Sequence, residues 1–233
     1  MNLVRNTITF SLLAIIVVIL TMIFVAVRRY PALFSQPGAR LLVLEPVPIL
    51  GAYAVAVVWI GRIRGVEWDT RLRTAALYGL LGGILEILNI RIENGLSFAA
   101  HIPTAPVGFM LLIFASWGIA AFRTARALQS IRWGLLTAVA SAGICMLIAV
   151  AAGMAIQFFL AVPEPAYVAT WAEFKRSGWN DPRAFSLANT LDSAFTHLAV
   201  APFVALVVGG VASLLGQRRA LEGGGINSAA GQR

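Results

Sequence analysis

The sequence predicts an all-α polytopic membrane protein whose six transmembrane helices form one bundle, and three observations lead to that fold class. Of the 233 residues, 59% are apolar and 12% are charged, whereas about a quarter of the residues in a soluble domain carry charge. The mean hydropathy is +0.83. Six apolar runs, separated by arginine-bearing connectors, are long enough to cross a hydrocarbon core of about 30 Å at about 1.5 Å per residue, the third only just.

The charge pattern indicates a lipid bilayer rather than nucleic acid as the partner of this chain. The formal net charge is +8, but the arginines lie in short connectors, where they orient helices and meet anionic headgroups. We therefore expect no nucleic-acid partner. The single cysteine, Cys145, lies inside an apolar run and excludes an intramolecular disulfide.

One six-helix domain is expected over residues 1–220, followed by a Gly- and Ser-rich tail. The first run is interpreted as a retained helix rather than a cleaved signal peptide, because it exceeds about 15 apolar residues and Arg28 and Arg29 replace a small-residue cleavage site. The tail is predicted to be disordered. The spans are expected at about residues 7–27, 41–61, 74–92, 102–122, 133–162 and 185–215, with the tail at 221–233.

Two carboxylates lie inside predicted spans near their ends. Glu45 precedes Pro46 and Pro48, so it is either exposed by a break in the second helix or an interfacial group before a helix that begins at Pro46. Glu86 follows small residues at positions 75, 79 and 83, whose spacing allows close helix approach, and it should point into the bundle. An inward carboxylate is costly unless it is paired or protonated.

The fifth and sixth spans carry two more small-residue stripes with polar ends. Gln157 ends the stripe on the fifth span, and Asn189, Ser193 and His197 begin the stripe on the sixth at a spacing of four. Between them, residues 167–175 predict a short amphipathic helix at the interface. The tryptophans are interpreted as interfacial belts, with Trp59, Trp68, Trp117 and Trp133 on one side and Trp171 and Trp179 on the other.

The polar residues should gather near one face of the bilayer. With six spans both termini share a side, and the polar ends of the second, third, fifth and sixth helices reach the opposite side, where they are expected to form a pocket. Eleven of the 18 Lys and Arg residues fall on the side of the termini, which predicts a plasma or inner membrane protein with cytoplasmic termini. The candidates for binding or proton handling are Glu45, Glu86, Asn89, Gln157, Asn189, Asp192 and His197.

Catalytic and metal motifs are weak in this chain. Ser193 and His197 can touch at i and i+4, but no nucleophile-presenting glycine turn surrounds the serine. His197, Asp192 and Glu86 have the ligand types that zinc or iron prefers, yet the sequence contains no HExxH, ExxH or CxxC motif. A bis-histidine haem would need His101, which lies in a connector. We therefore predict no metal and no cofactor, and name no catalytic residue.

Three classes of function remain open. The leading hypothesis is a small-solute or proton-coupled transporter, with Glu86 as the ionisable group and Asp192 and His197 as its partners. The alternative is a membrane-embedded enzyme, metal-dependent or not, that acts on a lipid-soluble substrate. The third is a non-catalytic membrane subunit, in which the polar groups only satisfy one another or in which residues 194–215 span the bilayer and leave Asp192 in water. The sequence is also compatible with an oligomer.

Overall fold

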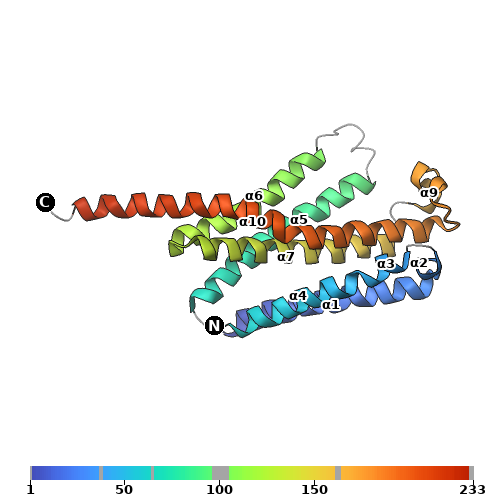
Figure 1. Ribbon diagram of the computed structural model, residues 1–233, viewed down its shortest axis with the longest axis horizontal. Coiled ribbons are helices and arrows are strands. Elements are labelled where there is room, and N and C mark those ends of the chain that lie inside the picture. The colour runs from blue at the N-terminus through green and yellow to red at the C-terminus, as the bar shows by residue number, and fades with distance from the viewer. Residues whose placement is uncertain (1, 37–38, 64–65, 96–104, 161–163, 231–233) are drawn as a thin grey trace.

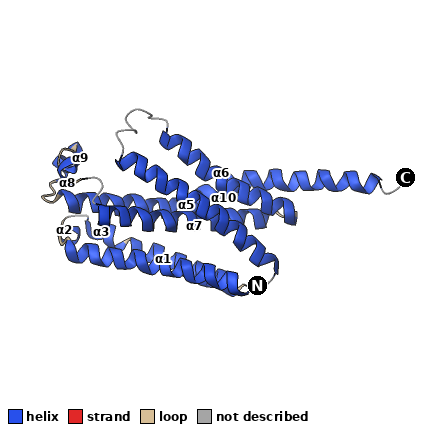
Figure 2. Ribbon diagram, turned by 180° about the vertical axis from the view of Figure 1, so that it is seen from behind, coloured by secondary structure: helices blue, strands red, loops and turns tan. Residues whose placement is uncertain are grey.

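The computed structural model of the chain is all-helical and confirms the predicted fold class. It describes residues 2–36, 39–63, 66–95, 105–160 and 164–230, and no strand occurs within these ranges (Figure 2). Six helices in the described ranges are long and apolar enough to cross a membrane, so the chain is a polytopic helical membrane protein. They are formed by α1 (Asn2–Arg29), α4 (Pro46–Arg62), α5 (Val66–Gly95), α6 (Ala105–Leu128), α7 (Ile131–Ala155) and α10 (Pro182–Ala230). The second span begins before α4, at Leu41, and the fifth continues beyond α7 to Leu160.

Short helical segments connect the long helices. Helices α2 (Ala32–Ser35) and α3 (Ala39–Leu44) lie between α1 and α4, and the π-helix η1 (Ile156–Leu160) continues α7. Helices α8 (Pro165–Val168) and α9 (Ala172–Ser177) precede α10. The prediction of one amphipathic helix over residues 167–175 is therefore wrong in its extent, because the chain turns between α8 and α9 at residues 169–171.

Helices α5 and α10 extend farthest beyond their predicted bounds. Helix α5 begins eight residues before position 74, because Trp68 and Arg71 in its first turns are buried and contact Trp133 of α7. Helix α10 continues to Ala230, with no proline after Pro202 to stop it. It thus includes residues 221–230 of the tail, whose disorder in solution stays a prediction. At about 1.5 Å per residue, its 49 residues extend well beyond a bilayer core.

Helix α7 is the centre of the bundle, and α5, α6 and α10 all pack against it. Thirteen of its 25 residues are buried. Glycines allow the neighbouring backbones to approach it: a Cβ atom at Gly79 of α5 would lie 2.7 Å from Ile144 Cβ, and one at Gly209 of α10 would lie 2.5 Å from Ala138 Cβ. The small-residue stripes of α5 and α10 are therefore packing surfaces against α7.

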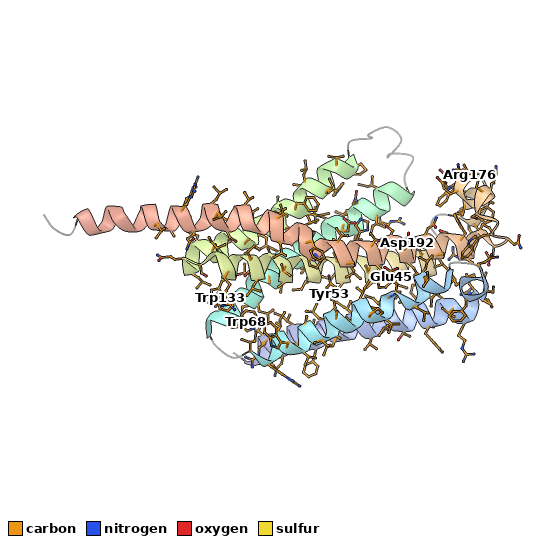
Figure 3. All side chains as sticks on the ribbon, in the orientation of Figure 1. Glu45, Tyr53, Trp68, Trp133, Arg176 and Asp192 are labelled. Carbon is orange, nitrogen blue, oxygen red and sulfur yellow. The ribbon has the colours of Figure 1, made fainter. Side chains whose placement is uncertain are left out.

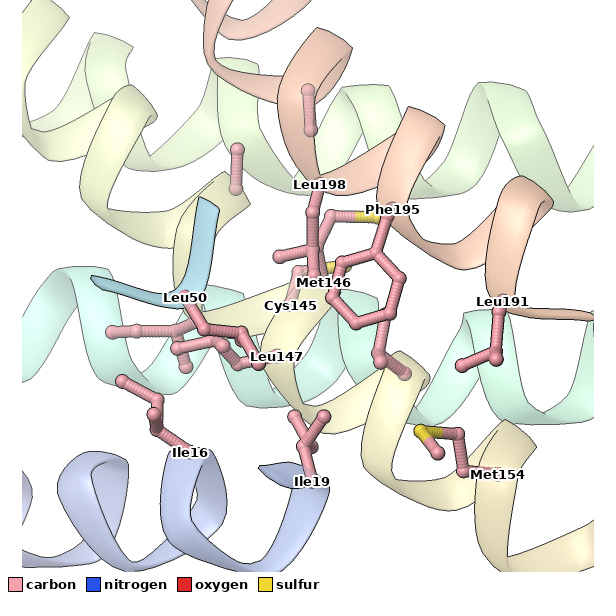
Figure 4. Packing of buried hydrophobic residues seen from close by; sticks show 14 of the residues in the cluster. Ile16, Ile19, Leu50, Cys145, Met146, Leu147, Met154, Leu191, Phe195 and Leu198 are labelled. Carbon is pink, nitrogen blue, oxygen red and sulfur yellow. The ribbon is translucent and has the colours of Figure 1, made fainter. Parts of the chain in front are cut away.

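Helices α1 and α4 form a hairpin along one side of this bundle (Figure 1). The buried apolar face of α1 consists of Leu12, Ile16, Ile19, Ile23 and Ala26, which recur at the helical spacing of four, three, four and three. Ile16 and Ile19 extend toward Leu50 of α4 and the side chains of α7 (Figure 4). The hairpin is thus held by an ordinary apolar contact face.

The outward faces of the long helices are apolar. Phe10 on α1 is 70% exposed, Leu111 on α6 is 60% exposed and Phe203 on α10 is 69% exposed. Large exposed apolar patches are rare on soluble monomers, but a lipid bilayer solvates them without cost. The surface composition therefore agrees with the membrane assignment that helix length supports.

Both ends of the chain lie at the same end of the bundle, and α8 and α9 lie at the other (Figure 1). The tryptophans divide differently from the predicted belts. Trp59 is 61% exposed and fits a belt, whereas Trp117 is 1% exposed and packs against Phe114 with ring centroids 5.3 Å apart. The belt interpretation of Trp117 is wrong, because α6 turns this side chain inward.

Candidate functional site

A cavity of about 610 Å³ lies between α5, α6, α7 with η1, and the first half of α10. It is at the end of the bundle away from the termini, where α6 diverges from α10 (Figure 1). Trp171, in the turn between α8 and α9, also lines it. The sequence predicted a pocket built by the second helix instead of the fourth, but α4 contributes no residue to this cavity and α6 supplies one wall.

The wall contributed by α6 and most of the floor contributed by α7 are apolar. These surfaces consist of branched, thioether and aromatic side chains, which offer van der Waals contact and no hydrogen bond beyond the indole of Trp117. They are Val107, Met110, Ile113, Phe114 and Trp117 on α6, and Met146, Val150 and Met154 on α7. An apolar body of modest size is therefore the part of a ligand that this region would accept.

The opposite part of the lining is polar. Glu86 and Asn89 come from α5, Gln157 comes from η1, and Asn189, Ser193 and His197 come from α10 at the spacing of four that the sequence predicted. Ser186 and Thr190 of α10 complete this group. The polar and apolar surfaces face one cavity, so its lining is amphipathic.

Gln157 is fixed by two hydrogen bonds to α10. Its Nε2 donates to Ser186 Oγ and to Thr190 Oγ1, each at 3.0 Å. The Thr190 hydroxyl donates its own hydrogen to the Ser186 carbonyl at 3.0 Å, so Thr190 Oγ1 can only accept from Gln157. This donor pattern favours the amide orientation in which the nitrogen faces the two hydroxyls. Gln157 Oε1 is buried and finds no hydrogen-bond partner among the described residues.

The wide turn of η1 determines where Gln157 points. A π-helix admits one extra residue per turn, and such turns occur often at functional sites. Gln157 is the one buried residue of η1, while Phe159 and Leu160 of the same turn are exposed. The π-helix therefore directs an amide toward the cavity and α10 at the position where α7 ends.

Asn89 is the second buried amide of the cavity. Its side chain is 9% exposed, and its Oδ1 finds no hydrogen-bond partner among the described residues. Asn89 lies about one helical turn before the level of Gln157, because a Cβ atom at Gly153, one turn before Gln157, would lie 3.7 Å from Ile90 Cδ1. Glu86, one turn before Asn89, is half-buried on the same cavity.

Hydrogen bonds at the helix ends order the polar end of the site. Asp181 Oδ1 accepts from the backbone N–H groups of Arg183 and Ala184 at 2.8 and 3.2 Å, so it caps the first turn of α10, with Pro182 at the first helical position. Arg183 Nη2 donates to the Gln157 carbonyl at 2.6 Å. A cation at the end of α7 with η1 satisfies one of its terminal carbonyl groups.

The structure places five of the seven candidate residues on the cavity and two elsewhere. Glu86, Asn89, Gln157, Asn189 and His197 line it. Glu45 is exposed at the N-terminus of α4, which begins at Pro46, and Asp192 is exposed on another face of α10 (Figure 3). Neither lines the cavity. His101, named above as a haem ligand candidate, lies outside the described residues. Sequence reasoning missed Ser186, Thr190 and Trp171, of which only the first two gave a signal, through their helical spacing from Asn189 and Ser193.

Ser193 and His197 do contact each other, as their spacing predicted. His197 Nδ1 lies 2.6 Å from the Ser193 carbonyl oxygen and 3.4 Å from Ser193 Oγ. A nitrogen that donates to a carbonyl cannot at the same time accept the serine proton, so this geometry does not activate Ser193 as a nucleophile. Among the described residues, no three His, Cys, Asp or Glu side chains are close enough to hold a metal ion.

The comparisons with known proteins add no family. The chain matches no protein-family model, no curated protein and no solved structure.

Proposed function

We propose that the protein is a small membrane carrier that binds a lipid-soluble or amphipathic solute in the cavity and couples its movement to a proton on Glu86. The observation that carries this proposal is the amphipathic lining, with an apolar wall on α6 facing amide, hydroxyl and carboxylate groups on α5, η1 and α10. Such a lining binds a molecule with an apolar body and a polar group.

The place of Glu86 supports its assignment as the ionisable group. It is half-buried on the cavity, in the part of α5 that lies within an apolar span. Carboxylates at such depth are rare in membrane helices and serve most often in proton or substrate handling. His197 is the other titratable group on the same cavity, whereas Asp192 does not line the cavity and therefore leaves the proposal.

A catalytic role has less support than a binding role. The Ser193 and His197 pair has the wrong donor pattern for a nucleophile, and the described residues hold no metal-ligand cluster. A purely structural role has less support because two buried amide oxygens on the cavity lack protein partners in the described chain. Groups that merely pin helices together would use their hydrogen-bonding capacity on one another.

Orientation follows from the positive-inside rule and is part of the proposal. With the termini in the cytoplasm of a plasma or inner membrane, the cavity would open near the non-cytoplasmic face. Reporter fusions at the C-terminus test this: a fluorescent protein that matures only in the cytoplasm should be bright, and alkaline phosphatase should be inactive. The reverse pattern would place the cavity near the cytoplasmic face.

The binding part of the proposal is tested by filling the cavity. A Cβ atom at Gly153 would meet only Ile90 Cδ1, at 3.7 Å, so the side chain of Gly153→Leu would enter the cavity without a backbone clash. Gly51→Leu is the matched control, because a Cβ atom there meets nothing within 4 Å and α4 does not line the cavity. Mass spectrometry of protein extracted in native lipid discs should find a small molecule with the wild type and Gly51→Leu that is lost with Gly153→Leu. Identical small-molecule content in all three would contradict binding in this cavity.

The carrier part is tested by access from two sides. In a Cys145→Ala background, a single cysteine at Val204, which lines the cavity, should react with a membrane-impermeant thiol reagent from either face of a proteoliposome, because a carrier opens to each side in turn. Val207→Cys is the control, since Val207 is 69% exposed on the lipid-facing surface and should stay unreactive. Reaction of the cysteine at position 204 from one face only would indicate a binding protein that does not transport.

A further inference from the structure

Two side chains that line the cavity carry a hydrogen-bond acceptor that has no partner in the described chain. Gln157 Oε1 and Asn89 Oδ1 are both buried, in side chains that are 6% and 9% exposed. A buried polar atom without a hydrogen bond destabilises the protein by about 1–3 kcal/mol relative to a satisfied one. A bound molecule that donates hydrogen bonds to both oxygens would remove this cost.

The hydrogen-bond network favours one orientation of the Gln157 amide. Both Nε2 hydrogens are used, one for Ser186 Oγ and one for Thr190 Oγ1. A flipped amide would require the Thr190 hydroxyl to give up its hydrogen bond to the Ser186 carbonyl. In this orientation Gln157 keeps an acceptor oxygen without a protein partner and has no amide hydrogen left for a ligand.

The charge of the lining also favours a ligand that donates hydrogen bonds. Among the described residues that line the cavity, Glu86 is the one acidic side chain and His197 the one histidine, and none is Lys or Arg. A carboxylate, phosphate or sulfate group of a ligand would meet acceptor oxygens and the Glu86 carboxyl group, and it would find no Lys or Arg among the described lining residues. An anionic head group is therefore disfavoured, whereas a hydroxyl or amine group is matched.

We propose that the ligand of this cavity is an amphiphile whose head group donates hydrogen bonds, a hydroxyl or an amine, to Gln157 Oε1 and Asn89 Oδ1. Its apolar body lies against Met110, Phe114 and Trp117 of α6. The volume of about 610 Å³ accommodates a fused aromatic ring system or a comparable aliphatic body. This inference rests on the proposed binding function and adds the chemistry of the solute to it.

The test uses pyrene derivatives that differ in one group. The probes are 1-pyrenemethanol, 1-pyrenemethylamine and the methyl ether of 1-pyrenemethanol, which keeps the oxygen and lacks the donor. Binding to the full chain in phosphatidylcholine nanodiscs is measured by energy transfer from tryptophan to pyrene, since Trp117 and Trp171 both line the cavity. Empty nanodiscs and nanodiscs with the cavity-filled variant Gly153→Leu give the background signal from pyrene that is dissolved in the lipid and not bound in the cavity.

The wild type should bind the alcohol and the amine about tenfold more tightly than the ether, as one or two hydrogen bonds in a water-poor site predict. In Asn89→Leu and in Gln157→Leu, the affinity for the alcohol should fall to within about threefold of the affinity for the ether. Asn89→Asp keeps an acceptor and should retain the preference for the alcohol. Asn180→Leu, an exposed amide away from the cavity, is the matched control. The comparison of alcohol and ether uses the wild type alone, so it remains a test even if a variant fails to fold.

The outcomes separate this inference from the binding function on which it rests. Equal binding of alcohol and ether, or a preference unchanged by both leucine variants, would mean that water alone satisfies the two oxygens, and it would overturn the head-group assignment while leaving the cavity as a binding site. Energy transfer that is the same in the wild type and Gly153→Leu for every probe would overturn both.

Discussion

The hydroxyl of Tyr53 on α4 donates a hydrogen bond of 2.8 Å to the backbone carbonyl of Leu198 on α10. Leu198 is four residues before Pro202, the proline inside this helix. Proline has no N–H group, so the carbonyl four residues earlier loses its helical donor. In a membrane another group must donate a hydrogen bond to this carbonyl, and the Tyr53 hydroxyl does so. The hydrogen bond also ties the α1 and α4 hairpin to the bundle.

Tyr53→Phe should lower the free energy of unfolding by about 1–2 kcal/mol, because it leaves a buried carbonyl without its donor. The same substitution in a Pro202→Ala background should have less than half that effect, since alanine restores the helical N–H. Thermal unfolding of the four proteins in one detergent gives the interaction as a double-mutant cycle. Equal losses in both backgrounds would show that Tyr53 does not serve the carbonyl freed by Pro202.

Gly209→Leu should destabilise the protein by about 3 kcal/mol, because its Cβ atom would lie 2.5 Å from Ala138 Cβ and force α10 away from α7. Gly210→Leu is the control: its Cβ atom would meet only Leu135 Cδ2, at 3.8 Å, and it carries the same change in helix propensity. The midpoint of thermal unfolding in detergent should therefore fall sharply for the first variant and little for the second. Similar midpoints would refute close packing at this crossing.

The fold followed from the sequence because its signals are redundant. Span length, connector charge and the spacing of small residues are separate features, and a membrane permits little besides helices for a chain this apolar. The spacing of Gly79 and Gly209 from neighbouring small residues predicted the packing faces that α7 occupies. The start of α5 was less predictable, because the burial of Arg71 against Trp133 involves residues far apart in the sequence.

The membership of the cavity was predictable only in part. Position along a span predicts depth, so Glu86, Gln157 and His197 could be placed at one end of the bundle. Direction around a helix decides access to the cavity, and Asp192, five residues from His197, is rotated from it by about 140°. Apolar wall residues on α6 carry no distinguishing pattern. The π-helix that aims Gln157 has no signal that sequence reasoning could read.

Arg71→Lys should destabilise the protein by about 1–2 kcal/mol. The Arg71 guanidinium carbon lies 3.6 Å from the centroid of the Trp133 ring, and the arginine side chain is 7% exposed. A planar guanidinium stacks on an indole with little water to compete, whereas a lysine ammonium keeps the charge and loses the stacking. Arg73→Lys, at an exposed position of the same helix, should have no measurable effect. A loss of the same size in both variants would attribute the effect to charge placement rather than to the ring.

Glu86→Gln should remove the pH dependence of conformational exchange while leaving the fold intact. If a proton on Glu86 biases which side of the cavity is open, the labelling rate of a cysteine at Val204 from the face of the termini changes with pH in the wild-type background. Glutamine has nearly the same shape and no titratable group, so its labelling rate should follow only the titration of the thiol itself, which every variant shares. His197 is the other titratable group on the cavity, and His197→Gln separates its contribution.

Glu45→Gln is the matched control for this experiment, because Glu45 is exposed and does not line the cavity. It should behave as the wild type at every pH. Circular dichroism and the thermal midpoint in detergent establish that each variant is folded. A pH dependence that survives Glu86→Gln and disappears with His197→Gln would transfer the proton-handling role to the histidine. Loss of folded protein with Glu86→Gln would instead show that the carboxylate stabilises the fold around α5. The cavity would then bind its solute without a proton on Glu86.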